Sequence, residues 1–219
     1  FLVADALAQG CDYLVTTGGR QSNHCRQTAA AAAKFGLGCS LVLTGEAPTS
    51  ETQTAVSGNL LLDQLLGAHL YWTGPRTRQE VMLDVAAELR TMGHKPYVIP
   101  LGGSNVMGAT GYVKAMEELT DQLQAERLNV DFIVFASSSG GTQAGMVLGA
   151  AIYNFPGQII SISIDHPAAE LQTQVAALAT ATATHLGLGT VSLAARIDVN
   201  DDYLRSEEHT SELQSHSGI

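Results

Sequence analysis

Short apolar segments of the chain alternate with longer segments that carry apolar residues at helical spacing. The short segments, rich in β-branched and aromatic residues, have the length of buried strands: 12–16, 39–43, 68–72, 96–100, 131–136 and 158–164, with a further strand beginning near 196–199. The longer segments predict helices over 1–9, 22–34, 57–66, 76–92, 109–124, 142–153 and 168–185. Because the strands are almost wholly apolar, the sequence predicts an α/β fold with open, mostly parallel sheets and helices on both faces.

The composition of the 219-residue chain is that of a folded protein. It is 45% hydrophobic and 15% charged, which excludes a disordered chain and a coiled coil. The formal net charge of −10, without a basic stripe, argues against a nucleic-acid partner. The sequence contains no run of 18 apolar residues, so it predicts no membrane-spanning helix. The three cysteines match no zinc spacing and suit a reducing compartment, so we expect a cytoplasmic protein.

Both ends of the chain have unusual sequences. The first residues, from Phe1, have the pattern of a helix without an N-cap, so we expect residues upstream of them. The last fifteen, 205–219, resemble the translation of a common sequencing adapter, and a solvated polar tail is the alternative. We therefore expect a fragment, truncated at both ends, whose biological sequence stops near Leu204.

A first polar loop follows the strand at 12–16. It contains two glycines and then Gln21, Ser22, Asn23 and His24, at the start of a predicted helix. A helix N-terminus offers free N–H groups to an anion, so this loop predicts a site for a carboxylate or phosphate. A polar turn with an N-cap is the alternative. Cys25, in the first helical turn, is expected to be a packing residue rather than a nucleophile.

A second polar loop, 137–142, joins the strand at 131–136 to the next helix. Its serines and two adjacent glycines suit a phosphate, because glycines let backbone N–H groups approach it and hydroxyls add donors. The loop matches neither a Walker motif nor the dinucleotide fingerprint. Asp165, which ends the next strand, keeps open a nucleotide-binding alternative in which it would hold a ribose.

A third glycine-rich stretch, 101–111, includes Ser104 and Asn105. It could close a site from a third side or connect two domains. The histidines are scattered without metal-ligand spacing, so no metal site is expected.

The polar loops, together with three further segments, resemble the D-cysteine desulfhydrase and 1-aminocyclopropane-1-carboxylate (ACC) deaminase family. The matching segments are FLVADAL at 1–7, TTGGRQSNHCRQTAAAAA at 16–33, GNLLLDQLLGA at 58–68, YVIPLGGSNVMGATGY at 97–112 and ASSSGGTQAG at 136–145. Members of this family use pyridoxal phosphate and have the tryptophan synthase β-like fold, also called fold type II. The resemblance implies two α/β domains with the cofactor between them, here a smaller domain over 1–101 and part of a larger one over 102–204.

The resemblance also implies roles for residues of the two polar loops. The cofactor phosphate would be held by Ser138, Ser139, Gly140, Gly141 and Thr142. Asn23 would hydrogen-bond the 3′-oxygen of pyridoxal phosphate. Ser22, with Gln21 and His24, would receive the substrate carboxylate, and Ser22 is also a candidate catalytic residue.

The chain departs from the family at both ends: the resemblance implies a C-terminal part, with an active-site tyrosine and the partner of the pyridine nitrogen, beyond Tyr203, and a lysine segment before Phe1. The family's Schiff-base lysine belongs to a segment that precedes the residues matching Phe1 and Leu2, and that segment is absent here. Because this lysine binds the cofactor covalently and moves the α-proton, we expect the fragment alone to be inactive. For the full-length protein, the resemblance implies a small amino-acid substrate and allows a homodimer.

His24, directly after Asn23, favours the desulfhydrase branch, whose reaction turns D-cysteine into pyruvate, ammonia and hydrogen sulfide. The TQAGM run at 142–146 is closer to the deaminases. An ACC deaminase and a cysteate sulfo-lyase therefore remain alternatives within the family. A non-catalytic nucleotide- or anion-binding α/β module is the alternative from a different class.

Overall fold

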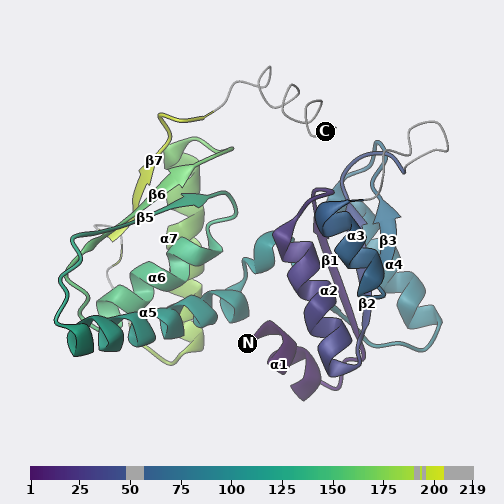
Figure 1. Ribbon diagram of the computed structural model, residues 1–219, viewed down its shortest axis with the longest axis horizontal. Coiled ribbons are helices and arrows are strands. Elements are labelled where there is room, and N and C mark those ends of the chain that lie inside the picture. The colour runs from purple at the N-terminus through teal and green to yellow at the C-terminus, as the bar shows by residue number, and fades with distance from the viewer. Residues whose placement is uncertain (48–56, 190–192, 194–195, 205–219) are drawn as a thin grey trace. The chain divides into compact units, whose positions relative to one another are not determined.

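The computed structural model describes residues 1–47, 57–189, 193 and 196–204. The tail predicted at 205–219 lies outside these residues. The chain folds as two compact units, Phe1–Gly103 and a second unit that begins at Ser104 (Figure 1).

The first unit is built on a four-stranded parallel sheet. Its strands are β1 (Tyr13–Gly18), β2 (Gly38–Leu43), β3 (His69–Trp72) and β4 (Pro96–Val98), in the order β3-β2-β1-β4. Since β1 lies between β2 and β4, the loops that follow β1 and β4 leave the sheet at its topological switch point. Open α/β sheets bind ligands at such a point.

Helices cover both faces of this sheet. On one face, α1 (Leu2–Ala8), α2 (Asn23–Phe35) and α3 (Gly58–Leu65) contribute Ala6, Cys25, Ala29, Ala32 and Leu60 to a core cluster. On the other face, α4 (Arg78–Thr91) packs four apolar side chains against the sheet: Val81, Met82, Val85 and Leu89. The first unit therefore has one core on each side of its sheet. The 3₁₀ turn η1 (Leu101–Gly103) follows β4.

The second unit contains a three-stranded parallel sheet in the order β5-β6-β7 (Phe132–Ser137, Gln158–Ser163, Asp198–Asn200). Its helices α5 (Val106–Glu126), α6 (Gly141–Ile152) and α7 (Ala168–His185) share one core with the sheet. Ile133 and Phe135 of β5 face that core, whereas Phe132 and Val134, on the opposite face of the strand, are each 58% exposed.

The predicted α/β class, with parallel sheets flanked by helices, is confirmed, and the predicted elements end within three residues of the observed ones. Local signals account for this agreement. Ser22 caps α2, which ends at Gly36 in the left-handed region (φ +69°). Thr77 and Glu80 form a capping box that begins α4. The start of α5 differs most, at Val106 instead of 109, because the Asn105 side chain accepts a bond from the Gly108 N–H and caps the helix earlier.

Candidate functional site

The loop after β1 is held in a close turn by Gly18 and Ser22. A Cβ atom at Gly18 would lie 2.6 Å from Ser22 Oγ and 2.8 Å from Cys25 Sγ, so only glycine fits there. Ser22 Oγ accepts a hydrogen bond from the Cys25 N–H at 3.2 Å. This bond uses Ser22 as an acceptor and leaves its hydroxyl hydrogen available to a ligand at the N-terminus of α2.

His24 lies at the switch point, with its ring toward β1 and the end of β4. Its Nε2 is 2.8 Å from Thr16 Oγ1, and the Thr16 hydroxyl donates to the carbonyl oxygen of Ile99 at 2.9 Å. Because the single hydroxyl hydrogen is used on Ile99, Nε2 must carry the hydrogen toward Thr16. Burial lowers the pKa of His24. The ring is thus neutral at pH 7 and its remaining nitrogen, Nδ1, is an acceptor.

Gln21 and Asn23 are tied to the start of α3. The Asn59 N–H donates to Gln21 Oε1 at 2.8 Å, and Asn59 Nδ2 donates to the Gln21 carbonyl oxygen at 2.8 Å and to Asn23 Oδ1 at 2.9 Å. Gln21 Nε2 in turn donates to the carbonyl oxygen of Ser57 at 3.1 Å. The prediction from sequence missed Asn59; its place in the family-like GNLLL run was the only available signal.

The loop after β5 has the geometry expected of an anion cradle. Gly140 is the N-cap of α6 in the left-handed region (φ +73°) and offers no side chain to the first-turn N–H groups of the helix. Ser138 donates to Asp165 Oδ2 at 2.6 Å. The loop brings Ser139, Gly140, Gly141 and Thr142 to one helix N-terminus, where an anion is favoured, whereas Ser138, predicted to bind the phosphate, has its hydroxyl hydrogen engaged by Asp165.

The third glycine-rich stretch contributes Ser104 to this same loop. Ser104 Oγ donates to Ser139 Oγ at 2.6 Å and accepts from the Gly141 N–H at 3.2 Å. A Cβ at Gly141 would lie 2.5 Å from Ser104 Oγ, so the close approach requires a glycine. Ser104 is thus a second residue that the prediction did not assign to the site.

The cysteines of the first unit are packing residues. Cys11, Cys25 and Cys39 are buried and free. Burial raises the pKa of Cys25 to about 11 and that of Cys39 to about 12, so both thiols are neutral at pH 7. The interpretation of Cys25 as a packing residue is confirmed.

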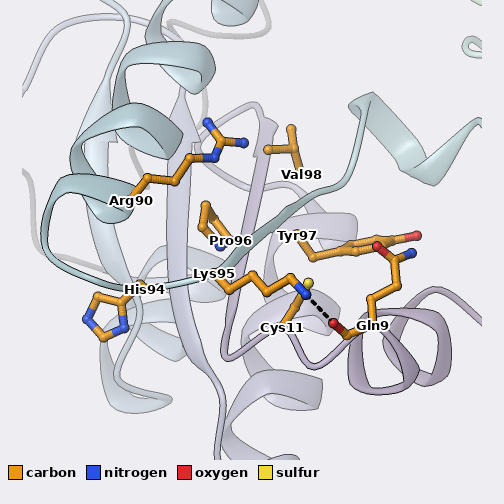
Figure 2. A pocket seen from close by; sticks show the side chains of 8 residues that line it. All are labelled: Gln9, Cys11, Arg90, His94, Lys95, Pro96, Tyr97 and Val98. Atoms are coloured by element: carbon orange, nitrogen blue, oxygen red, sulfur yellow. Dashed lines mark hydrogen bonds between the residues drawn. The ribbon is translucent and has the colours of Figure 1, made fainter.

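A cavity of about 510 Å³ lies at the amino end of β4, away from the predicted loops (Figure 2). Arg90, His94 and Lys95 line it, together with Cys11 and Tyr97. Lys95 Nζ already donates to the carbonyl oxygen of Gln9, and His94 Nδ1 contacts Asp12 Oδ2 at 2.8 Å. None of the predicted site residues lines this cavity, so we assign it no role in the site.

The described residues contain neither a metal cluster nor a membrane-spanning helix. Among them, no group of three or more His, Cys, Asp and Glu side chains could hold a metal ion. None of the helices in the described part of the chain is long and apolar enough to cross a membrane.

The chain is similar to named proteins over nearly its whole length. It is 37% identical over 204 residues to a D-cysteine desulfhydrase of Serratia proteamaculans, and 38% identical to one of Salmonella paratyphi B. Each match covers 93% of this chain and 61% of the relative, so the chain spans about three fifths of these proteins.

Solved structures give the same picture. A crystal structure described as an ACC deaminase homologue has a TM-score of 0.79 and 31% identity, covering 100% of this chain and 67% of the other. A diaminopropionate ammonia lyase of Escherichia coli, at 15% identity, a TM-score of 0.55 and coverage of 76% and 49%, shares the fold. The model of the pyridoxal-phosphate dependent enzyme family matches residues 1–215. The two polar loops thus stand in a chain that belongs to the family of pyridoxal-phosphate dependent enzymes.

Proposed function

We propose that this chain is the part of a D-cysteine desulfhydrase that carries the cofactor-phosphate loop and the substrate-carboxylate loop. In the complete polypeptide, the reaction is β-elimination of D-cysteine to pyruvate, ammonia and hydrogen sulfide. The observation that carries the proposal is the pair of polar loops, each of which leaves the carboxyl end of a strand and opens a helix. The relatives named D-cysteine desulfhydrase, at 37% and 38% identity, support the choice of reaction.

The loop at 137–142 fits the phosphate of pyridoxal phosphate. Its glycines keep side chains away from the start of α6, and Ser139 and Thr142 supply hydroxyl groups. Ser104 supports the loop by bonding both Ser139 and the Gly141 N–H. We propose that these residues would hold the phosphate and so fix the cofactor, whose ring would supply an electron sink for the elimination when bound.

The loop at 18–24 fits the carboxylate of an amino acid. Ser22 keeps a hydroxyl hydrogen to donate, and the first turn of α2 adds N–H groups and the positive end of the helix dipole. His24 is engaged with Thr16, so we propose that it contributes its backbone N–H rather than its ring. Gln21 retains one hydrogen on Nε2 beyond the bond to Ser57.

Substrate choice is tested with the complete polypeptide. D-Cysteine, ACC and cysteate are supplied separately, and hydrogen sulfide, ammonia and sulfite are measured as products. We expect turnover of D-cysteine. Turnover of ACC with none of D-cysteine would overturn the desulfhydrase assignment in favour of the deaminase, which the similarity to the ACC deaminase homologue keeps as the second candidate.

We further propose that the complete enzyme is cytoplasmic.

We also propose that the 219-residue chain alone is inactive. The resemblance assigns the α-proton transfer to a lysine in a segment that this chain lacks. The purified chain, supplied with pyridoxal phosphate and D-cysteine, should release no hydrogen sulfide above a blank without protein. Cofactor-dependent turnover by the purified chain would show that another group moves the proton.

The alternative of a non-catalytic nucleotide-binding module is tested by ligand titration. Trp72, the single tryptophan, ends β3 and lies 5.0 Å under the Arg20 guanidinium of the first loop, so its fluorescence reports on that loop. We expect a response to pyridoxal phosphate and none to ATP or NAD. The opposite result would favour the module.

A further inference from the structure

We infer that Asn59 is a positioning residue that orients the side-chain amide of Asn23 toward the cofactor. The inference rests on the proposed function. It adds a residue of α3 that fixes which end of the Asn23 amide is presented to the 3′-oxygen of pyridoxal phosphate.

The orientation follows from a chain of hydrogen bonds with one polarity. The backbone oxygen of Gln21 can only accept, so the Asn59 atom that lies 2.8 Å from it must be the Nδ2 group. The same Nδ2 group lies 2.9 Å from the Asn23 side chain and donates its second hydrogen there. The Asn23 atom that receives this bond is therefore Oδ1, and its Nδ2 group, which has no partner among the described residues, remains as a donor.

The helix that carries Asn59 begins with a glycine and is anchored by its next residue. Gly58, directly before Asn59, has φ +60°, a backbone conformation that favours glycine. The Asn59 N–H is bound to Gln21 Oε1, and the next residue, Leu60, is 6% exposed in the core. Asn59 therefore holds the Asn23 amide from the first turn of α3, which Leu60 anchors in the core.

The orientation matters because the 3′-oxygen of the cofactor is a phenol that ionises. An N–H donor stabilises the phenolate form, whereas a carbonyl oxygen in the same place would repel it. Asn59→Asp is nearly isosteric but offers only acceptors. It would turn the Asn23 amide around, so that the Nδ2 group faces Asp and the carbonyl oxygen faces the cofactor.

The test compares two ligands that differ only at this oxygen. Pyridoxine 5′-phosphate and its 3-deoxy analogue lack the aldehyde and so cannot add to surface lysines. Both are titrated into the 219-residue chain and followed by Trp72 fluorescence. We expect N59D to weaken pyridoxine 5′-phosphate binding by about tenfold or more and to leave the affinity for the 3-deoxy analogue within about twofold of wild type, since the lost interaction is to the missing oxygen.

Controls separate this effect from charge and folding. Asn154→Asp, just beyond the C-terminal end of α6, controls for the change in net charge and should change neither affinity. Asn59→Ala controls for the local charge, because it removes the donor without placing a carboxylate beside the ligand, and it should still weaken pyridoxine 5′-phosphate more than the 3-deoxy analogue. Thermal unfolding checks that both Asn59 variants are folded, and if N59D is not, Asn59→Ala alone tests the difference between the ligands. If N59D weakens the binding of both ligands equally, or weakens the binding of neither, Asn59 does not have the proposed role. Absence of binding of either ligand to the wild-type chain overturns the proposed function instead.

Discussion

At the scale of single residues, Asp63 of α3 is unusual because its carboxylate is buried in the core. Its side chain is 0% exposed, and neither carboxylate oxygen has a hydrogen-bond partner among the described residues. Burial raises the pKa of Asp63 to about 6, while the nearby Arg26 acts in the opposite direction. Since burial penalises the charged form, the folded protein holds the Asp63 proton more tightly than the unfolded chain does.

Asp63 should make the stability of the first unit fall as pH rises. The folded state binds the Asp63 proton more tightly than the unfolded state, whose pKa is near 3.8, so the free energy of unfolding decreases through about pH 6. Asp63→Asn removes the ionisation. We expect it to match wild type near pH 4 and to exceed it by about 1–3 kcal/mol at pH 8, measured by urea unfolding. A difference that does not change with pH would contradict the raised pKa.

Thr16 joins His24 to the end of β4 through one hydroxyl group. Thr16→Val keeps the shape but leaves the Ile99 carbonyl oxygen and His24 Nε2 without this partner. We expect a loss of about 1–3 kcal/mol in the free energy of unfolding. Thr17→Val is the matched control, because it removes one hydrogen bond, to the Val42 carbonyl oxygen. It should lower the free energy of unfolding by less than Thr16→Val does. An equal cost for both would argue against the linked role of Thr16.

At the scale of elements, α5 and α6 pack through a row of glycines. A Cβ at Gly145 would overlap the carbonyl oxygen of Ala109 on α5 and lie 2.6 Å from Tyr112 Cβ. A Cβ at Gly149 would lie 2.7 Å from Met116 Cβ. The glycines at these helical positions let the two helices approach closely.

Gly145→Ala should therefore destabilise the second unit. The added methyl meets backbone atoms that cannot turn aside, so we expect a loss of about 1–3 kcal/mol from overpacking. Gly189→Ala is the control in the same unit, because a Cβ there has no neighbour within 4 Å. Thermal unfolding of both variants provides the measurement, and equal melting temperatures would contradict the predicted clash.

At the scale of the whole molecule, the sheet of the second unit exposes apolar side chains. Phe132 and Val134 project from one face of β5, and Ile164, after β6, is 54% exposed. Exposed apolar patches on a sheet promote association. We expect the 219-residue chain to self-associate with rising concentration, and Phe132→Thr with Val134→Thr to reduce this while unfolding remains cooperative. Light scattering that does not differ between wild type and the double variant would place the association elsewhere.

The sequence alone determined the elements, the class of fold and the family. Helix periodicity, apolar strands and turn signals such as Gly36 are local, since each depends on neighbours within one or two turns of the chain. The two polar loops were found for the same reason, because a run of polar residues after a strand can be recognised without knowing what lies beside it. The specific roles of their residues remain predictions.

Only the tertiary structure decided which other residues support those loops. Asn59 meets Asn23 across 36 positions of sequence, and Ser104 meets Ser139 across 35. The order β3-β2-β1-β4, which places the first loop at a switch point, depends on pairings between distant strands. The sequence around Asp63 does not indicate that its carboxylate is buried with no hydrogen-bond partner among the described residues. Such contacts arise when whole helices and strands pack together. Many residues contribute to the free energy of this packing, so no single stretch of sequence encodes the contacts.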